Sequence, residues 1–302
     1  MKGRTWFRLW ATLIGCQSVL AAESPVNGVP SQETVLRYFQ TDERYSFRVR
    51  LLDAVMKETS AEYGAYRLVP TEIKVTQARG LQLLEVNAGI DIAFIASSQE
   101  REAHLLPIKD PILSGILGFR VNLIHQGQQE NFRKIEQLDE LKEHYVAGFG
   151  SQWADMAILQ HNGLRVAGVA NYENIFDMLQ HERFHYFPRG INEAWGEIAR
   201  KGHDYPSLRV EETLALYYPY PVYFFVSKKD VTLAERLAKG LNLVKAGPVY
   251  KALFLKEHGE DIRRADLAHR KLFVLHNPAL ESQKLPDGTF WWLDESIMKQ
   301  LP

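Results

Sequence analysis

The sequence predicts an α/β protein of two lobes, each built on a central, mostly parallel sheet flanked by helices. Apolar residues follow strand spacing and helix spacing in turn along the chain, which is typical of parallel strands joined by helices. One segment, 90–96, is almost wholly apolar, as expected of a strand buried on both faces of a parallel sheet. The length of 302 residues is sufficient for two domains with cores of their own.

The expected elements of the first lobe follow one another from residue 35 onward. A strand is expected at 35–39. Apolar residues between Phe47 and Met56 then recur at helical spacing, and Gly64 ends that helix. The elements expected next are a strand at 66–69, a helix at 76–87, the apolar strand at 90–96 and a strand at 119–125 that crosses to the second lobe.

The second lobe begins after the polar stretch 126–131 and continues the alternation. Helices are expected at 138–144, 154–161, 171–181 and 192–201, with strands at 145–149, 166–170, 184–187 and 208–216. A strand at 221–227 is expected to return the chain to the first lobe. Amphipathic helices at 233–245 and 249–257 then complete that lobe.

The first residues have the composition of an export signal. Lys2, Arg4 and Arg8 provide a positive start, and an apolar stretch too short to span a bilayer then ends in small residues. Because residues 1–22 contain no acidic side chain, we expect a signal peptide cleaved after Ala22 and a periplasmic location. The alternative is an amphipathic N-terminal helix.

The single cysteine, Cys16, lies within the expected signal. The segment that ends in Cys16 also resembles a bacterial lipobox, so a lipid anchor at this residue is an alternative to the cleaved signal. Cleavage after Ala22 removes three cations and changes the formal charge from −1 to −4. The remaining chain has no thiol for disulfides, metal sites or nucleophilic catalysis, and no basic field that favours nucleic acid. We expect a monomer.

Residues 87–101 carry a resemblance to a known family. They combine Gly89 and Asp91, a buried strand, and a Ser-x-x-Arg turn at Ser98 and Arg101, and the crossing strand 119–125 follows. In this order the chain resembles the family 3 bacterial extracellular solute-binding proteins, the periplasmic receptors of polar amino-acid ABC transporters. The resemblance implies the type II two-lobed periplasmic binding fold, a small polar ligand and no cofactor. It also implies a membrane ABC permease or a membrane sensor as the partner.

The same resemblance implies that the chain crosses between the lobes twice. The expected limits are a signal peptide at 1–22, a discontinuous first lobe at 23–120 and 225–302, and a second lobe at 121–224. The crossing strands 119–125 and 221–227 are expected to act as the hinge on which the lobes close.

Arg101 is the central candidate for ligand binding. It follows the end of a strand, where ligands of open α/β folds bind, and a guanidinium can hold a carboxylate through two charge-assisted hydrogen bonds. By resemblance, Arg101 matches a carboxylate-binding position of the family. The alternative is a surface arginine paired with Glu100 or Glu102.

Polar groups on both lobes are expected to assist Arg101. Ser97 and Ser98 offer hydroxyl groups. On the facing lobe, the turn of Ser151 and Gln152 is expected to open a helix whose start attracts anions. By resemblance, Ser151 matches a second carboxylate-binding position.

The site also departs from the family's pattern. The strand positions that help to hold a ligand ammonium correspond here to Phe94 and Ala96, with a register that can slip by one. Arg189 stands where the family has an ammonium-binding Asp. Arg101 and Arg189 across one cleft favour a ligand with two anionic or acceptor ends, whereas a surface Arg189 paired with Glu193 is the alternative.

Three aromatic residues are candidates for the floor of the cleft. Tyr45, Trp153 and Phe187 offer flat apolar surfaces to a ligand, and packing in the core is the alternative role for each.

The motif His181-Glu182-Arg183-Phe184-His185 supports a different function. It fits H-E-x-x-H, in which two histidines on one helix face bind zinc and the glutamate activates water. A zinc metallopeptidase is therefore the alternative function. Against it, aromatic strand formers follow the motif and Pro188 stops any helix soon after it. We therefore expect no metal and a binding protein instead of an enzyme.

Overall fold

The computed structural model describes residues 1, 3, 33–72, 75–280 and 282–302. The predicted signal peptide at 1–22, its cleavage after Ala22 and the alternative lipidation of Cys16 fall on a part of the chain that is almost entirely outside the described residues. Within the described ranges, no helix is both long enough and apolar enough to cross a membrane.

Most of the strands lie where the alternation of the sequence predicts them. Their bounds are β1 Thr34–Tyr38, β2 Tyr66–Pro70, β3 Ala93–Ala96, β4 Leu105–Ile108, β5 Phe119–His125, β6 Val146–Gly150, β7 Arg165–Val169, β8 Tyr186–Gly190, β9 Leu208–Val210, β10 Leu214–Tyr217, β11 Val222–Ser227 and β12 Lys271–Val274.

Helices separate most of these strands. Their bounds are α1 Ser46–Glu58, α2 Ser60–Tyr63, α3 Gln77–Glu85, α4 Gln99–His104, α5 Gln129–Arg133, α6 Leu138–His144, α7 Met156–His161, α8 Tyr172–Gln180, α9 Ala194–Lys201, α10 Val231–Ala246, α11 Pro248–Ala265 and α12 Glu295–Met298. Short 3₁₀ helices occur at η1 Glu43–Tyr45, η2 Ile116–Gly118, η3 Gln126–Gln128 and η4 Leu267–His269.

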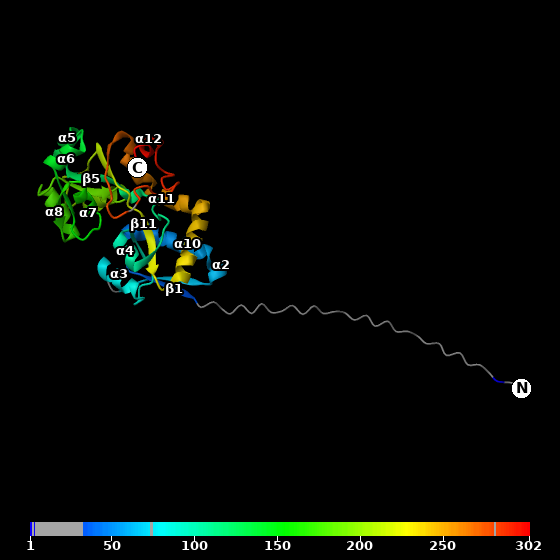
Figure 1. Ribbon diagram of the computed structural model, residues 1–302. Helices are drawn as coiled ribbons and strands as arrows, with labels where there is room; N and C mark the ends of the chain where they lie inside the picture. Colours follow the sequence, from blue (N-terminus) through cyan, green and yellow to red (C-terminus); the bar gives the residue numbers. More distant parts are fainter. Residues whose placement is uncertain (2, 4–32, 73–74, 281) are drawn as a thin grey trace. The chain divides into compact units, whose positions relative to one another are not determined.

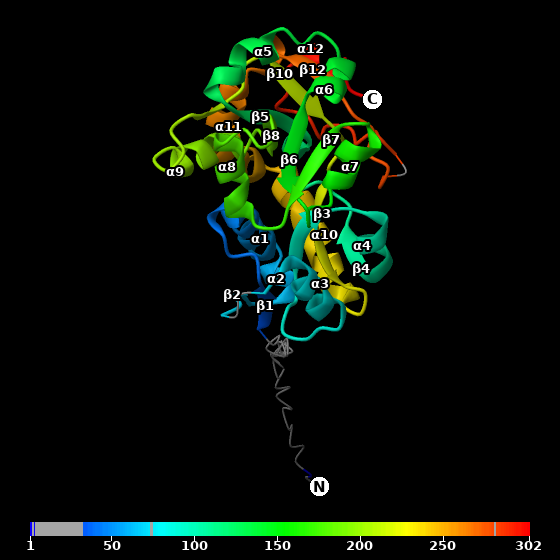
Figure 2. The same ribbon diagram turned by 90° about the vertical axis from the view of Figure 1, so that its left-hand side faces the viewer.

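Strand pairing divides the molecule into two groups of elements. In one group β1 pairs with β2, and β3, β11 and β4 form a sheet in the order β3-β11-β4. In the other group the order is β12-β10-β5-β8-β6-β7, and β9 pairs with β5. Figures 1 and 2 show β1, β3 and β11 together with α1–α4 and α10, apart from the group of β5, β8 and β6 with α5–α8.

The first group behaves as one layer, because β1 lies beside the chain that leads into β3. The carbonyl oxygen of Arg37 accepts hydrogen bonds from the N–H groups of Asp91 and Ile92 at 2.9 and 3.4 Å. Among the described strands, every antiparallel pairing involves β5 or β11, and the other pairings are parallel. The predicted two-lobed α/β fold is therefore confirmed, with parallel pairings in both groups and antiparallel pairings at β5 and β11.

The apolar segment 90–96 is buried on both faces, as predicted, but its ladder is not parallel. β3 pairs with β11 in the antiparallel direction. Phe94 and Phe224 face the core that contains α1, whereas Ile95 and Phe225 face a second cluster with Leu84 of α3. Packing on both faces explains the apolar sequence of β3. A strand in an antiparallel pair can be covered on both faces just as a strand in a parallel sheet can.

Three passages join the two sheets: α10 and α11 lead from β11 to β12, and short segments lead from β4 to β5 and from β10 to β11. These crossing segments, 109–118 and 218–221, lie side by side. The N–H of Tyr218 donates to the Gly118 carbonyl at 3.2 Å, and the N–H of Ile112 donates to the Val222 carbonyl at 2.9 Å. The predicted hinge strands 119–125 and 221–227 lie almost wholly within β5 and β11, each inside one sheet. The residues that cross between the sheets at these two places are the segments before them, 109–118 and 218–221.

One element differs from the lobe limits that the sequence suggests. Residues 225–302 are expected in the first lobe, but β12 pairs in parallel with β10 in the sheet of the other group. The sequence predicts no strand there, because β12 is short and only partly buried.

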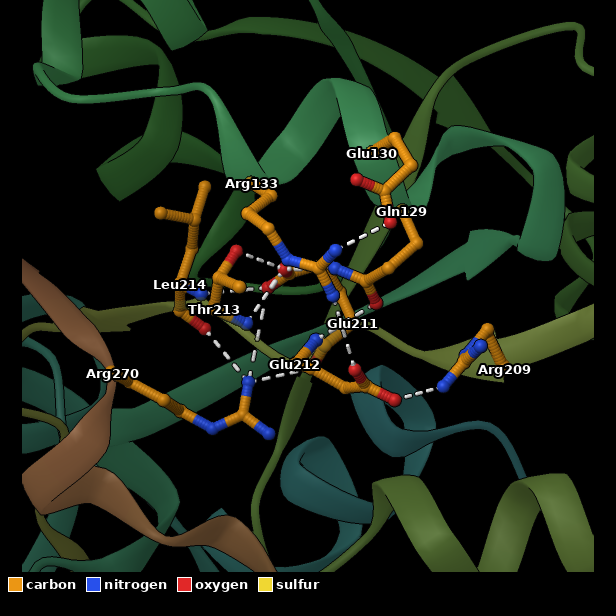
Figure 3. Close-up of polar contacts among 9 residues, drawn as sticks. All are labelled: Gln129, Glu130, Arg133, Arg209, Glu211, Glu212, Thr213, Leu214 and Arg270. Carbon is orange, nitrogen blue, oxygen red and sulfur yellow. Dashed lines mark hydrogen bonds and ion pairs between the residues drawn. The ribbon is translucent and has the colours of Figure 1, made fainter.

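A buried carboxylate holds the bend between β9 and β10. Glu211 is fully buried and accepts hydrogen bonds from the backbone N–H groups of Thr213 and Leu214, each at 2.7 Å. It also accepts from Nε2 of Gln129 at 2.9 Å, and Nη1 of Arg270 lies 3.8 Å away (Figure 3). Because both strands pair with β5, this bend sets where β10 enters the second crossing.

Candidate functional site

A cavity of about 290 Å³ is lined by residues from both groups of elements. One wall comes from the chain after β1, from η1, α1 and α4, and from the end of β3. The facing wall comes from β5, from the turn before α7, from β8 and from the start of α9. The volume is that of a small-molecule site at the lower end of the usual range.

Two arginines of the first wall are anchored on one edge of β3. Nη1 of Arg48 donates to the Phe94 carbonyl at 2.9 Å, and Nη1 of Arg101 donates to the Ala96 carbonyl at 2.6 Å. The Gln40 side chain bonds the N–H and the carbonyl of Phe94 at 2.8 and 2.9 Å. Since alternate residues of a strand direct their carbonyls to the same side, both arginines lie along the edge that β11 does not cover.

The ring of Tyr45 lies beside two guanidinium groups. The Cζ atoms of Arg44 and Arg48 are 5.0 and 4.8 Å from its centroid. Burial lowers the pKa of Arg48, and the opposite effects of Tyr45 and Glu193 offset this decrease only in part. Burial also acts on Arg44, but Tyr45 and Asp42 outweigh it and raise the pKa of that group. An arginine pKa lies so far above neutral pH that both groups remain cations.

Arg189 lies on the facing wall within a cluster of opposite charge. Its Nε and Nη2 donate to the two oxygens of Glu197 at 2.7 and 2.6 Å, and Nη2 lies 3.0 Å from Glu193. Its Cζ is 4.9 Å from the ring of Trp153 and 5.0 Å from that of Phe187. Burial lowers its pKa, but the two carboxylates outweigh burial and raise it well above the ordinary value. The alternative of a surface pair holds only in part, since the pairing with Glu193 is present but Arg189 is buried.

A second buried ion pair lies next to Arg189. Nη2 of Arg120 donates to Asp155 at 2.7 Å, and the hydroxyl of Tyr218 donates to the same oxygen at 2.9 Å. Nη1 of Arg120 lies 3.7 Å from Glu193. Burial raises the pKa of Glu193, but the charges of Arg189 and Arg120 outweigh burial and lower this pKa below its ordinary value. The group therefore remains ionised.

The charges around the cavity do not cancel. The arginines that line it are Arg44, Arg48, Arg101, Arg120 and Arg189, and the acidic residues are Asp42, Asp155 and Glu193. Each of these carboxylates lies within ion-pair distance of an arginine. Arg48 and Arg101, by contrast, have no carboxylate at ion-pair distance among the residues that the structure describes. Two arginines without an ion-pair partner, the surplus arginines of the site, therefore lie on the same wall.

The structure brings together part of the set of residues predicted to bind the ligand. The predicted residues that line the cavity are Tyr45, Arg101, Gln152, Trp153 and Arg189. Arg101 bonds a backbone carbonyl and does not pair with either neighbouring glutamate. Trp153 stacks on the buried ring of Phe187 at 5.9 Å and 22°, so one aromatic faces the cavity and the other supports it.

The remaining predicted residues do not line the cavity. The hydroxyl of Ser97 donates to Glu102, and that of Ser98 accepts the Arg101 N–H at 3.3 Å as the N-cap of α4. Ser151 is exposed, and its N–H donates to a carbonyl of β7 at 3.0 Å. Because α7 begins later than predicted, at Met156, Ser151 is not at the start of a helix.

Several residues of the site were not singled out from the sequence. Arg48 has a detectable signal, because it lies on the apolar face of α1 with Leu51 and Leu52, where an unpaired charge is out of place. Arg120 has a similar one, a charge inside an otherwise mostly apolar strand. Gln40 and Asp155 lie in connecting segments and have no comparable local signal.

The His181-Glu182-x-x-His185 motif lies in the turn between α8 and β8 and not in a helix. Glu182 has a φ of 52° and accepts a hydrogen bond from Gln128 at 2.6 Å. Nδ1 of His185 accepts the Val146 N–H at 2.8 Å. The two imidazoles therefore do not share a helix face, as the zinc motif requires. Within the described part of the chain, no group of three or more His, Cys, Asp or Glu residues is arranged to hold a metal.

Comparison with known sequences does not assign this chain to a family. No family model matches it, and no curated protein matches it.

Comparison with solved structures assigns the fold. An ancestral arginine-binding protein bound to glutamine is 16% identical, with a TM-score of 0.55 over 75% of this chain and 98% of that one. The chain has the fold of periplasmic amino-acid-binding proteins. A periplasmic binding protein with high arginine specificity from Salmonella typhimurium is also 16% identical, with a TM-score of 0.54 over 74% and 98% of the two chains.

A third similar structure is part of a transporter. It is the binding component of an ABC transporter from Wolinella succinogenes, complexed with lysine, at 16% identity and a TM-score of 0.54 over 74% and 95% of the chains. The resemblance to periplasmic solute-binding proteins is thus confirmed at the level of the fold. The named neighbours are binding proteins, and their ligands are small amino acids.

Proposed function

We propose that the protein is an exported solute-binding protein that captures a small polar ligand with a carboxylate or another anionic group. The observation that carries this proposal is the pair of surplus arginines, Arg48 and Arg101, on one wall of the cavity. Amino-acid ligands in proteins of the same fold support a carboxylate as the group recognised. The captured ligand would pass to an ABC permease or signal occupancy to a membrane sensor.

Capture would occur by closure of two lobes around the ligand. We propose lobes that follow the two groups of elements, 23–120 with 225–302 and 121–224, with β12 assigned to the second. The paired crossing segments 109–118 and 218–221 would form the hinge. Closure excludes water, and the lower local dielectric strengthens the bond between an arginine and the ligand. The chemistry is therefore binding and not catalysis.

The two walls would have different roles. Arg101 and Arg48 would bind the anionic part of the ligand, since each has guanidinium donors beyond the one bonded to β3. Trp153 would cover the apolar part of the ligand from the facing wall. The paired charges of Arg189 and Glu193 would orient other polar groups.

A thermal-shift screen of amino acids, dicarboxylates and small peptides tests the proposal. At least one carboxylate ligand is expected to raise Tm, and Arg101→Gln is expected to weaken its binding about tenfold or more. Arg209→Gln, an exposed arginine outside the cavity, is the matched control and should leave the affinity unchanged. The proposal fails if no compound raises Tm, or if the two variants bind the ligand equally well.

A further inference from the structure

We propose that the ligand is a small dicarboxylate whose two anionic ends bind Arg48 and Arg101. This inference rests on the proposed function and specifies its substrate class. It follows from how the two arginines are placed, from which acceptor groups of the cavity are already occupied, and from the burial of Arg48.

The two guanidinium groups are bonded to acceptors at a defined spacing. Their acceptors, the carbonyls of Phe94 and Ala96, belong to alternate residues of β3 and are therefore about 6.5 Å apart along the strand. Each guanidinium has five N–H donors, and one of them is used on the strand. A ligand with carboxylates at both ends of a short methylene chain can therefore bond both groups at once.

The cavity offers little to a ligand ammonium on this wall. Gln40 and Arg48 both donate to the Phe94 carbonyl, and Arg101 takes one of the two acceptor positions of the Ala96 carbonyl. The carboxylates that line the cavity are already bonded to arginines, with Asp42 on Arg44, Asp155 on Arg120, and Glu193 on Arg120 and Arg189. A zwitterion would bring its cation next to two unneutralised guanidinium groups, whereas a dianion neutralises both.

The burial of Arg48 increases the binding free energy that a second anionic group would contribute. Arg48 is only 7% exposed, and among the described residues its hydrogen bond goes to a neutral carbonyl. A buried cation without a charged partner is unfavourable unless a ligand provides the charge. The lowered pKa of Arg48, caused mainly by burial, agrees with this geometry.

Isothermal titration of the purified protein with three matched acids tests the inference. Glutarate has two carboxylates, pentanoate keeps one of them on the same carbon chain, and 4-aminobutanoate replaces the second with an ammonium. Glutarate should bind at least about tenfold more tightly than pentanoate, and 4-aminobutanoate more weakly than either. Glutamine is titrated as the amino-acid reference.

Two variants and a control localise the effect. In Arg48→Gln and in Arg101→Gln, the ratio of glutarate to pentanoate affinity should fall toward one, because a single cation remains. This ratio does not depend on the fraction of protein that folds, and Arg101 is less buried than Arg48, so a loss of stability in one variant does not hide the result. Arg67→Gln, an exposed arginine paired with Glu33, should keep the ratio of the unmodified protein.

The outcomes separate the inference from the function on which it rests. Equal binding of glutarate and pentanoate, or tighter binding of glutamine or 4-aminobutanoate than of glutarate, would overturn the dicarboxylate class and leave a carboxylate-binding protein. Failure of every acid, glutamine included, to bind would overturn both proposals.

Discussion

Replacement of Glu197 by glutamine should destabilise the protein through the buried charge of Arg189. Glu197 is 3% exposed and accepts two hydrogen bonds from Arg189, at 2.7 and 2.6 Å, and one from the hydroxyl of Tyr172 at 2.8 Å. Glutamine keeps the shape of the side chain but removes its charge. Its amide NH₂ also places a donor where an N–H group now donates.

The size of the effect follows from what remains around Arg189. Removal of one partner of a buried ion pair typically costs about 3–5 kcal/mol. Glu193 stays 3.0 Å from Nη2 of Arg189, so the lower end, about 3 kcal/mol, is expected. At roughly 2 °C per kcal/mol for a chain of this size, Tm should fall by about 6 °C.

Urea unfolding followed by tryptophan fluorescence measures the loss. The matched control is Glu173→Gln, because Glu173 makes an exposed ion pair with Lys201 and should contribute less than about 1 kcal/mol. In the double variant Arg189→Met/Glu197→Gln the loss should be smaller than the sum of the two single losses, since no buried charge is left without its partner. If Glu197→Gln costs no more than Glu173→Gln at the same m value, Glu197 does not hold the charge of Arg189.

Three further substitutions test separate parts of the structure. Burial lowers the pKa of His258 to about 3, helped by Arg48 and Arg50. In the unfolded chain His258 takes up a proton below its ordinary pKa near 6.5, whereas in the folded protein it stays neutral at pH 5. Lowering the pH from 7 to 5 should therefore reduce the free energy of unfolding by about 2 kcal/mol at this residue. His258→Leu should remove that part of the pH dependence. Glu211→Ala should cost about 3–5 kcal/mol in urea unfolding, because Arg270 and several donors lose their acceptor (Figure 3). In Gly150→Ala the new Cβ would lie 2.5 Å from the Trp153 ring, so both Tm and ligand affinity should fall. Equal pH dependence with and without His258, a loss below 1 kcal/mol for Glu211→Ala, or unchanged affinity in Gly150→Ala would contradict the respective argument.

The elements that the sequence predicts well are those with strong local patterns. The strand at 119–125 and the helix at 138–144 have the predicted bounds, since an apolar run and a helical period with acidic residues at its start are readable within a few residues. β4 and β12 were not predicted, because both are short and depend on pairing with β11 and β10 from distant parts of the chain. The parallel pairing expected for β3 was wrong for the same reason: burial is readable from a sequence, and strand direction is not.

The site shows the same division between local and distant signals. Arg101 was predicted because it follows a strand end and because Ser98, three residues before it, completes the Ser-x-x-Arg turn of the resemblance. Arg48 was not found, since its partner on β3 lies 46 residues away. Pairing of Arg189 with Glu193, four residues on, was the alternative to ligand binding, but the two-pronged bond is made by Glu197. That contact arises because α9 brings Glu197 to Arg189 on β8, which no local spacing indicates.

The central claim is that the arginine-lined cavity captures a small anionic ligand. The most direct test is the crystal structure of the protein with the tightest-binding acid of the titrations. Carboxylate oxygens of that ligand should lie within hydrogen-bond distance of Arg48 and Arg101, with Trp153 over its apolar part. A ligand bound elsewhere on the protein, or one in the cavity that contacts neither arginine, would contradict the claim.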